Sequence, residues 1–315
     1  MAGWTADDIP DQSGRTALVT GGNSGLGYQT VLQLARKGAH VLLAARDRGR
    51  GTAALERLGA EAPGSHAELA LLDLADLASV ERFSTEFLAS GQGLGLLVNN
   101  AGVMAIPHRE LTAQGYERQF GTNHLGHFAL TGRLLPALTR QPGSRVVTVS
   151  SNRHKAAKGI DFDDLQGEHS YRPWPAYDQS KLANAMFVLE FDRRLGAAGL
   201  DVVSAGAHPG FAATNLQITG PRSGGTGLVA RGMGLATRLF AQPASDGALP
   251  TLYAATAGNV RGGEYFGPHG RGEMRGHHPQ LVRFSAAAHD AAAAARLWAV
   301  SEELTGVTFE APTTQ

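Results

Sequence analysis

The chain has 315 residues, of which 43% are hydrophobic, and its 28 basic and 28 acidic side chains give a formal net charge of +0. Because no global field attracts nucleic acid, an acidic substrate or an anionic membrane surface, the charge gives no support for partners of those kinds. Cysteine is absent, which excludes disulfides, thiolate nucleophiles and cysteine-ligated zinc.

The same composition bears on location. The opening residues Met1 to Asp8 are acidic and lack a basic region followed by a long apolar one, and no run of 18 apolar residues occurs. We therefore expect no signal peptide and no membrane span. The lack of cysteine also fits a reducing compartment, so the expected location is cytoplasmic.

Apolar, β-branched runs alternate with longer segments of helical periodicity. The runs lie at about residues 15–20, 40–45, 67–72, 94–99, 144–150 and 201–207. This alternation is typical of repeated βαβ units, whose right-handed crossovers place helices on both faces of a parallel sheet. We predict an α/β fold with a doubly wound parallel sheet, formed by 1–315 as a single domain, with a ligand at the carboxyl ends of the strands.

A glycine-rich turn follows the first predicted strand and precedes an amphipathic stretch from Tyr28 to Lys37. In such a unit Gly21 permits the tight turn, Gly25 lets the backbone approach a pyrophosphate, and Gly27 allows close packing of helix on strand. The helix N-terminus then offers amide donors and a positive dipole to the phosphates. An ordinary loop is the alternative, and the flanking strand and helix favour the nucleotide interpretation.

The end of the second predicted strand bears on which dinucleotide binds. An acidic side chain there would accept from the adenosine ribose hydroxyls and repel a 2′-phosphate, but the position is Ala45. Arg46 follows and offers a charge-assisted fork for phosphate, with Arg48 and Arg50 nearby. Asp47 weakens this preference, and Arg48 and Arg50 also fit an ordinary solvated helix start. The pattern favours NADP(H), with NAD(H) as the alternative.

Tyr177 and Lys181 are spaced four apart, which on a helix places a phenol beside an ammonium. Unperturbed tyrosine titrates near pKa ~10, and a positive charge at ~4 Å is worth roughly 4 kcal/mol at an effective dielectric of about 20. A lowering of the tyrosine pKa by about three units would suit a general acid/base. Many solvated helix faces carry the same two residue types, so the pair gains weight only from the other motifs.

Further motifs follow in a fixed order. Asp73-Leu74 and Asn99-Asn100-Ala101-Gly102 each follow a strand, Asn123 lies in a helix, and Ser150-Ser151 close the strand from Arg145 to Val149. Together with Thr20-Gly21-Gly22-Asn23-Ser24-Gly25-Leu26-Gly27 and the pair Tyr177 and Lys181, they resemble the short-chain dehydrogenase/reductase family over most of the chain. This resemblance implies a Rossmann-type fold. Thr122-Asn123-His124-Leu125-Gly126-His127-Phe128 and Ser180-Lys181-Leu182-Ala183-Asn184 are most similar to the retinol dehydrogenase and WW-domain oxidoreductase relatives.

The resemblance implies four catalytic residues. Tyr177 would donate a proton to the carbonyl oxygen during reduction and remove it during oxidation. Lys181 would lower the pKa of Tyr177 and hydrogen-bond the nicotinamide ribose. Ser151 would hold the substrate oxygen, and Asn123 would kink its helix and hold a water behind Lys181. Ser150 stays an alternative to Ser151, since adjacent strand residues point to opposite faces. Strand capping by the serines, and a local carbonyl bond for Asn123, are the structural alternatives.

The resemblance also implies the residues that hold the cofactor. Asp73 and Leu74 would flank the adenine, and Asn99 would secure the strand and the glycine turn. Thr214 would reach the carboxamide. The predicted cofactor-binding residues are Gly21, Asn23, Ser24, Gly25, Leu26, Gly27, Arg46, Asp73, Leu74, Asn100, Ala101, Gly102, Tyr177, Lys181, Pro209, Gly210 and Thr214.

Within the single domain, about 15–150 would mainly bind the cofactor and about 151–315 would carry the catalytic pair. The polar stretch 151–177 predicts a loop over one wall of the site. Residues 211–243, rich in Gly and Ser, resemble a substrate-binding lid, with a disordered loop as the alternative. The tail contains a predicted Ala-rich helix at 286–304.

No metal is predicted. His124 and His127 lie three apart, and His277 and His278 are adjacent in a Gly-rich loop. No third ligand has a convincing spacing, so packing or solvent exposure is the expected role of the first pair.

The sequence therefore predicts an NADP(H)-dependent oxidoreductase that interconverts an alcohol and a ketone or aldehyde. A lipophilic or aromatic substrate is expected from the subgroup resemblance and from apolar residues such as Met104, Trp174 and Phe211, which also fit a core. A catalytically silent NAD(P)-binding sensor or scaffold is the main alternative, and an epimerase or dehydratase is another. The resemblance also implies a homodimer or homotetramer, since relatives often pair through the helices that carry Asn123 and Tyr177, and a monomer is the alternative if the extended tail blocks one face.

Overall fold

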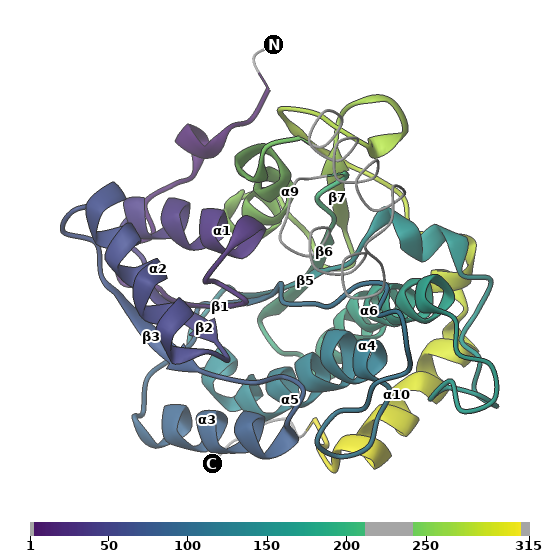
Figure 1. Ribbon diagram of the computed structural model, residues 1–315. Helices are drawn as coiled ribbons and strands as arrows, with labels where there is room; N and C mark the ends of the chain where they lie inside the picture. The colour runs from purple at the N-terminus through teal and green to yellow at the C-terminus, as the bar shows by residue number, and fades with distance from the viewer. Residues whose placement is uncertain (1–2, 212–241, 310–315) are drawn as a thin grey trace.

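The computed structural model describes residues 3–211 and 242–309. In these residues eight strands form one sheet in the order β3-β2-β1-β4-β5-β6-β7-β8 (Figure 1). They are β1 (Thr16–Thr20), β2 (His40–Ala45), β3 (Ala67–Leu71), β4 (Leu96–Asn99), β5 (Ser144–Val149), β6 (Val202–Ala207), β7 (Tyr265–Pro268) and β8 (Pro279–Leu281). Neighbouring strands are parallel except β7 and β8.

Helices cover both faces of the sheet, so the predicted doubly wound parallel fold is confirmed (Figure 1). One face carries α1 (Gly25–Arg36), α2 (Arg48–Glu61) and α9 (Ala244–Thr256). The other carries α3 (Leu77–Ala89), α5 (Gly126–Thr139) and α6 (Pro173–Ala197), and α10 (Ala291–Thr305) packs against α5 and α6. Shorter pieces are η1 (Ala6–Asp8), α4 (Arg118–Phe120), η2 (Gly121–Leu125), η3 (Asn152–Ala156), η5 (Arg271–Glu273) and η6 (Ala286–His289).

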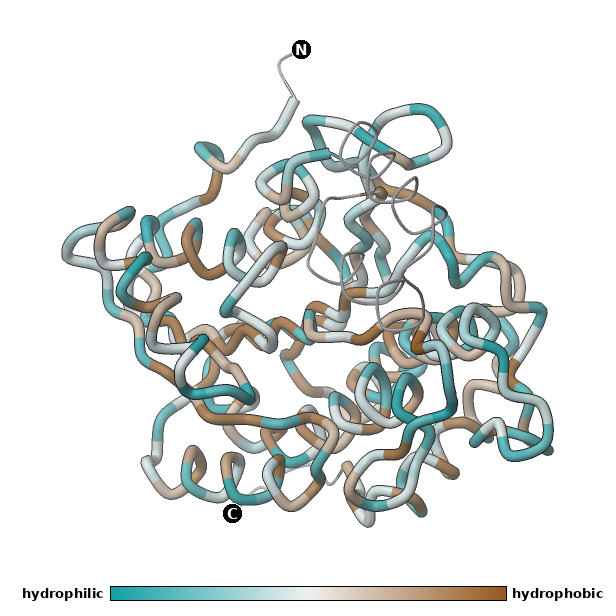
Figure 2. Tube along the Cα trace, in the orientation of Figure 1, coloured by the Kyte–Doolittle hydropathy of each residue, from teal (hydrophilic) through white to brown (hydrophobic). Residues whose placement is uncertain are grey.

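Each central strand contributes to two apolar cores. In β1, Ala17 and Val19 pack in the core under α1 and α9, whereas Leu18 packs in the core under α3 and α5. Side chains alternate along a strand with a period of two, so a strand covered on both faces reads as a continuous apolar run. Figure 2 shows this directly, with the central strands mostly hydrophobic and the outer loops more hydrophilic.

The strand order places a crevice at one edge of the sheet. β1 connects to β2 on one side, and β4 connects to β5 on the other, although β1 and β4 are themselves neighbours. The two connections leave in opposite directions, which opens a crevice at the carboxyl ends of β1 and β4. The glycine turn follows β1 and the segment Asn100-Ala101-Gly102 follows β4.

An aromatic cluster on the outer side of α6 joins distant parts of the chain. It contains Phe128, Phe187, Phe191, Trp298 and Phe309, and the Trp298 ring centre lies 5.0 Å from that of Phe128, 5.8 Å from that of Phe187 and 4.5 Å from that of Phe309. The C-terminal segment therefore supports the helix that carries Tyr177.

The tail departs from its prediction. The helix predicted at 286–304 begins at Ala291, because the Asp290 side chain caps it by accepting from the Ala293 N–H at 2.9 Å. The preceding residues Ala286–His289 form a 3₁₀ turn. Most of the predicted lid, 212–241, lies outside the described residues. Within 3–211 and 242–309, no helix has the length and apolarity required to cross a membrane.

Candidate active site

The turn after β1 has the geometry of a phosphate cradle. Gly21 and Gly25 have φ values of 64° and 54°, a region that favours glycine. A Cβ on Gly27 would lie 2.3 Å from the Gly21 carbonyl oxygen, so only glycine allows this approach. α1 begins at Gly25, and its N-cap Ser24 makes no side-chain capping bond. The first-turn amides therefore lack a capping side chain and suit an anionic pyrophosphate.

Thr20 and Asn100 join this turn to β4. The Asn100 Nδ2 donates to the Thr20 carbonyl oxygen at 2.7 Å, while the backbone N–H groups of Asn100 and Ala101 donate to Thr20 Oγ1 at 2.8 and 2.9 Å. The prediction that Asn99 secures the turn is therefore wrong. Asn99 points to the other face, where its Nδ2 donates to Thr131 Oγ1 on α5 at 3.0 Å. Sequence reasoning missed Thr20, whose signal is its place at the end of a buried strand.

The predicted cofactor residues collect at the carboxyl edge of the sheet. Those in the glycine turn and the start of α1 follow β1, Arg46 follows β2, the pair Asp73-Leu74 follows β3, Asn100 to Gly102 follow β4, and Pro209-Gly210 follow β6. Gly102 lies beside the catalytic candidates, because a Cβ there would be 3.1 Å from Asn123 Oδ1 and 3.6 Å from Lys181 Nζ. Thr214 lies outside the described residues.

The residues that follow β2 and β3, predicted to bind the adenosine part of the cofactor, differ in their exposure and hydrogen bonds. Asp47 is the N-cap of α2, and its Oδ1 accepts from the Arg50 N–H at 2.8 Å. Arg46 is exposed, and no ion pair involves it among the residues that the structure describes. Asp73 accepts from the Ala75 N–H at 2.9 Å, and Leu74 is buried against the start of α5. The acidic neighbour of Arg46 is thus occupied by helix capping.

α6 presents one polar face to the end of β5. Tyr177, Ser180, Lys181 and Asn184 recur at helical spacing and are all buried. Lys181 Nζ donates to the Val149 carbonyl oxygen at 3.0 Å and lies 5.8 Å from the centre of the Tyr177 ring. The phenol and the ammonium are therefore neighbours, as their spacing predicts.

The pKa values correct one expectation. Burial raises the pKa of Tyr177 to about 12, and the neighbouring Ser151 hydroxyl lowers it by a smaller amount. Burial also lowers the pKa of Lys181 to about 8. The predicted net lowering of the Tyr177 pKa is thus wrong for the protein groups alone, because burial of the phenol raises the pKa. The ammonium faces the ring and the Val149 carbonyl oxygen. Loss of hydration raises the pKa of the phenol by more than the Ser151 hydroxyl and the Arg153 charge lower it.

Of the two adjacent serines, Ser151 is the one near Tyr177. Its hydroxyl lies close enough to the phenol to lower the pKa of Tyr177, and it also accepts from the Arg153 N–H at 3.2 Å. Ser150 is buried, and its hydroxyl donates to the Lys181 carbonyl oxygen at 2.8 Å. The geometry therefore favours Ser151 as the substrate contact and gives Ser150 a structural bond.

Asn123 lies in a distorted turn of helix. Residues Gly121–Leu125 form a π-helical turn, which marks a local widening of the helix. The Asn123 side chain accepts from the Val103 N–H at 2.8 Å and donates from Nδ2 to the Val103 carbonyl oxygen and to Ser180 Oγ, each at 2.9 Å. It thereby ties the loop after β4 to α6.

The first histidine pair is buried. His127 Nδ1 lies 2.9 Å from the Asn123 carbonyl oxygen, which can only accept, so the proton is on Nδ1. Burial lowers the pKa of His127 to about 4 and that of His124 to about 3, so both rings are neutral near pH 7. His127 Nε2 then accepts from Thr20 Oγ1 at 2.9 Å, and His124 Nε2 pairs with Ser301 Oγ at 2.8 Å. In the described part of the chain, no three His, Asp or Glu side chains gather as metal ligands.

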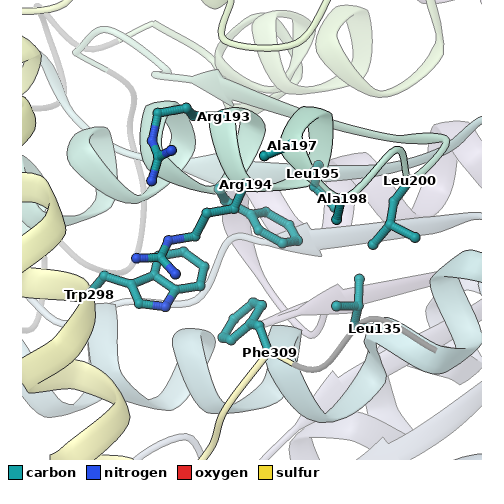
Figure 3. Close-up of a pocket in the computed structure, with 10 residues that line it drawn as sticks. Leu135, Arg193, Arg194, Leu195, Ala197, Ala198, Leu200, Trp298 and Phe309 are labelled. Atoms are coloured by element: carbon teal, nitrogen blue, oxygen red, sulfur yellow. The ribbon is translucent and has the colours of Figure 1, made fainter. Parts of the chain in front are cut away.

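A cavity of about 400 Å³ lies apart from these residues, between α5, α6 and the C-terminal segment (Figure 3). Figure 3 shows Arg194 beside the Trp298 indole, with its guanidinium carbon 4.3 Å from the ring centre, and Phe309 facing Leu135 and Leu200. None of the predicted catalytic or cofactor residues lines it. The cavity belongs to the outer surface of the helical layer.

Known proteins resemble the chain over most of its length. Residues 15–221 match the family model described as short chain dehydrogenase. The chain is 42% identical to the polyprenol dehydrogenase of Mus musculus over 304 residues, which is 95% of this chain and 86% of that protein. It is 39% identical to retinol dehydrogenase 14 of Mus musculus over 307 residues, or 93% of this chain and 86% of that protein.

Solved structures also resemble the chain over most of its length. An uncharacterised protein from Mycobacterium paratuberculosis has 43% identity and a TM-score of 0.80, with 98% of this chain and 100% of that chain covered. An NAD(P)-dependent dehydrogenase from Beutenbergia cavernae, with NADP bound at low occupancy, has 25% identity and a TM-score of 0.61, covering 80% of this chain and 94% of that chain.

The fold and the site thus define a dinucleotide-dependent oxidoreductase. The chain belongs to the short-chain dehydrogenase/reductase family, in its retinol dehydrogenase-like subgroup. Its cofactor is a nicotinamide dinucleotide, and the glycine cradle at Gly21, Gly25 and Gly27 fits the pyrophosphate of such a group.

Proposed function

We propose that this enzyme interconverts an alcohol and a ketone or aldehyde with NADP(H), and that its substrates are lipophilic or aromatic. The observation that carries the proposal is the cluster of Tyr177, Ser151 and Lys181 beside the loop Asn100 to Gly102, at the edge where the glycine cradle lies. The nicotinamide would supply or accept the hydride, and the protein would position the substrate and move a proton.

Each side chain has a distinct part in this proposal. The Ser151 hydroxyl donates to the substrate oxygen and fixes it near Tyr177. Tyr177, whose pKa of about 12 keeps it protonated near pH 7, donates its proton to that oxygen as an alcohol forms. Lys181, with a pKa of about 8, is mostly protonated at pH 7 and stabilises the tyrosinate that results. Asn123 positions Lys181 indirectly, through Ser180 and the loop after β4.

The preference for NADP(H) is supported by the end of β2. Arg46 is exposed there, and Asp47 is engaged as the cap of α2. A guanidinium binds phosphate through charge-assisted, bidentate hydrogen bonds, whereas a capped carboxylate is less able to bind ribose hydroxyls.

The substrate class is supported by the names of the relatives, which are polyprenol and retinol dehydrogenases. Both names describe long apolar alcohols. We further propose that 1–315 acts as one domain, which the single sheet of the described residues supports. We propose a cytoplasmic location, which the absence of cysteine fits.

Turnover tests the proposal. Purified protein is incubated with NADPH or NADH and with carbonyl compounds such as retinal, farnesal, cinnamaldehyde and propanal, and loss of reduced cofactor is followed by absorbance. Tyr177→Phe should lower kcat by about 100-fold or more and leave the Kd for NADPH nearly unchanged. Tyr253→Phe is the matched control, because that hydroxyl bonds Asn259 at 3.0 Å, away from the site.

Two results would contradict the proposal. Full turnover by Tyr177→Phe would remove the acid/base role. Tight NADPH binding without turnover of any carbonyl or alcohol would favour the sensor or scaffold instead.

A further inference from the structure

We propose that Trp174 forms one wall of the substrate site and selects carbonyl compounds that carry an aryl or alkenyl group next to the reacting carbon. The inference rests on the proposed function, because it assigns a substrate contact to the same site. It uses a side chain that neither the catalytic nor the cofactor-binding roles require.

Trp174 combines exposure with closeness to the phenol. It lies in the first turn of α6, three residues before Tyr177, and the two ring centres are 6.3 Å apart with the planes at 84°. Tyr177 is 4% exposed, whereas Trp174 is 40% exposed. Tryptophan is highly buried on average, so an open indole beside a buried catalytic phenol suggests a ligand contact.

The indole is held by an ion pair that also joins the catalytic segments. The Arg153 guanidinium carbon lies 5.0 Å from the indole centre, within cation–π range. Arg153 Nε donates to Asp178 Oδ1 at 2.6 Å, and Nη2 donates to Asp178 Oδ2. Arg153 follows Ser151 by two residues, and Asp178 follows Tyr177 directly. The pair that fixes the two catalytic segments to each other therefore also fixes the orientation of Trp174.

The start of α6 is attached to the loop after β4 as well. Gln119 is 0% exposed, and its Nε2 donates to the Pro173 carbonyl oxygen at 3.0 Å, while its Oε1 accepts from the Ala105 N–H at 2.7 Å. Ala105 has a φ of 50°, an uncommon value for a residue other than glycine. Gln119 thus holds this strained loop, which continues from Gly102, against the residue before Trp174.

These contacts place Trp174 between the loops that follow β4 and β5. Such loops line the ligand crevice of a doubly wound sheet. The part of the indole not covered by Arg153 and Tyr177 is a flat apolar surface. A conjugated group packs on such a surface by offset or edge-to-face contact, whereas a short aliphatic carbonyl would fill little of it.

Paired probes test the assignment. Reduction of cinnamaldehyde and of propanal is compared for wild type, Trp174→Ala and Trp174→Phe. Trp174→Ala should lower kcat/KM for cinnamaldehyde by about 10- to 100-fold, mainly through KM, and change kcat/KM for propanal by less than about threefold. Trp174→Phe should retain most of the cinnamaldehyde activity. Leu281→Ala, which removes a residue that is 61% exposed on β8, is the control and should change neither.

Failure of the inference is separable from failure of the proposed function. Equal loss of both activities in Trp174→Ala would overturn the selective role of the indole. If wild type reduces neither probe, binding decides the inference, and the proposed function itself fails only if no carbonyl compound or alcohol is turned over. With NADP present, cinnamyl alcohol should quench the tryptophan fluorescence of wild type saturably and that of Trp174→Phe much less. Equal quenching in the two proteins would overturn the inference.

Discussion

The side-chain amide of Asn123 and the backbone of Val103 exchange two hydrogen bonds, of 2.8 and 2.9 Å. The amide thus satisfies both backbone polar groups of Val103, as a neighbouring strand would do in a sheet. Its Nδ2 also donates to Ser180 Oγ on α6. A residue predicted for a proton path therefore also fixes the loop after β4 in place.

Asn123→Asp tests this structural bond. The substitution keeps the size but removes both N–H donors and buries a carboxylate facing the Val103 carbonyl oxygen. We expect the free energy of unfolding to fall by about 3 kcal/mol, measured by denaturant titration. Asn259→Asp is the control, since Asn259 is exposed and accepts from Tyr253, and it should change stability by less than about 0.5 kcal/mol. Equal stability of the two variants would contradict the bond's importance.

Gly27→Ala tests the phosphate cradle. The new Cβ would lie 2.3 Å from the Gly21 carbonyl oxygen and 2.6 Å from Asn100 Nδ2, so the turn must move. We expect the Kd for NADPH, measured by fluorescence titration, to rise by about tenfold or more. Gly59→Ala in α2 has no atom within 4 Å of the new Cβ and should instead stabilise the protein by about 0.5–1 kcal/mol. An unchanged Kd in Gly27→Ala would remove the cradle assignment.

Arg46→Ala tests the choice of cofactor. Loss of a charge-assisted fork should weaken NADPH binding by about tenfold or more and NADH binding by less than about threefold. Arg82→Ala, at an exposed position on α3, is the control and should alter the affinity for neither cofactor. If both cofactors lose affinity equally in Arg46→Ala, the arginine does not read the 2′-phosphate.

Lys181→Met separates stability from activity. Burial lowers the pKa of Lys181 to about 8, so near pH 7 the folded state bears the cost of a desolvated charge. Methionine has a similar shape without the charge, and we expect the free energy of unfolding at pH 7 to rise by about 1–3 kcal/mol while kcat falls.

Because the folded pKa is below the unfolded one, the unfolded state binds more protons between about pH 8 and 10.5. As the pH rises across that range, the free energy of unfolding of wild type should therefore increase relative to that of Lys181→Met. A less stable variant would contradict this account.

His124→Gln tests the acid sensitivity of the core. Burial lowers the pKa of His124 from 6.5 to about 3, so the unfolded state binds more protons than the folded state between those values. The contribution of this ring is fully present above pH 6.5 and is lost as the pH falls toward 3. The slope of stability against pH between 6 and 4 should be smaller in the variant by about 1 kcal/mol per unit. His66→Gln, at an exposed position, serves as the control, and an unchanged slope in His124→Gln would refute the effect.

Much of the fold could be predicted because long apolar runs are hard to mistake. The central strands are buried on both faces, so their composition alone marks them. The short strands β7 and β8 left no such signal, since Tyr265–Pro268 contains Gly and Pro and Pro279–Leu281 is largely exposed. β7 forms beside the end of β6 and β8 pairs with β7, so both strands depend on tertiary contacts.

The candidate site could likewise be predicted only in part. Spacing predicted that Tyr177 lies near Lys181, but it could not show that the fold buries the phenol, and this burial raises the pKa of Tyr177 where a lowering was predicted. Adjacent residues on a strand point to opposite faces of the sheet, and the sequence alone does not show which of the two faces carries the site. That ambiguity led to the wrong role for Asn99 and left Ser150 and Ser151 undecided until their partners were visible.

The aromatic cluster behind α6 has a consequence for biosynthesis. Phe187 and Phe191 leave the ribosome long before Trp298 and Phe309, the side chains that cover them. During that interval this apolar side of α6 is exposed to water, and transiently exposed hydrophobic surface of this kind makes a nascent chain prone to aggregation.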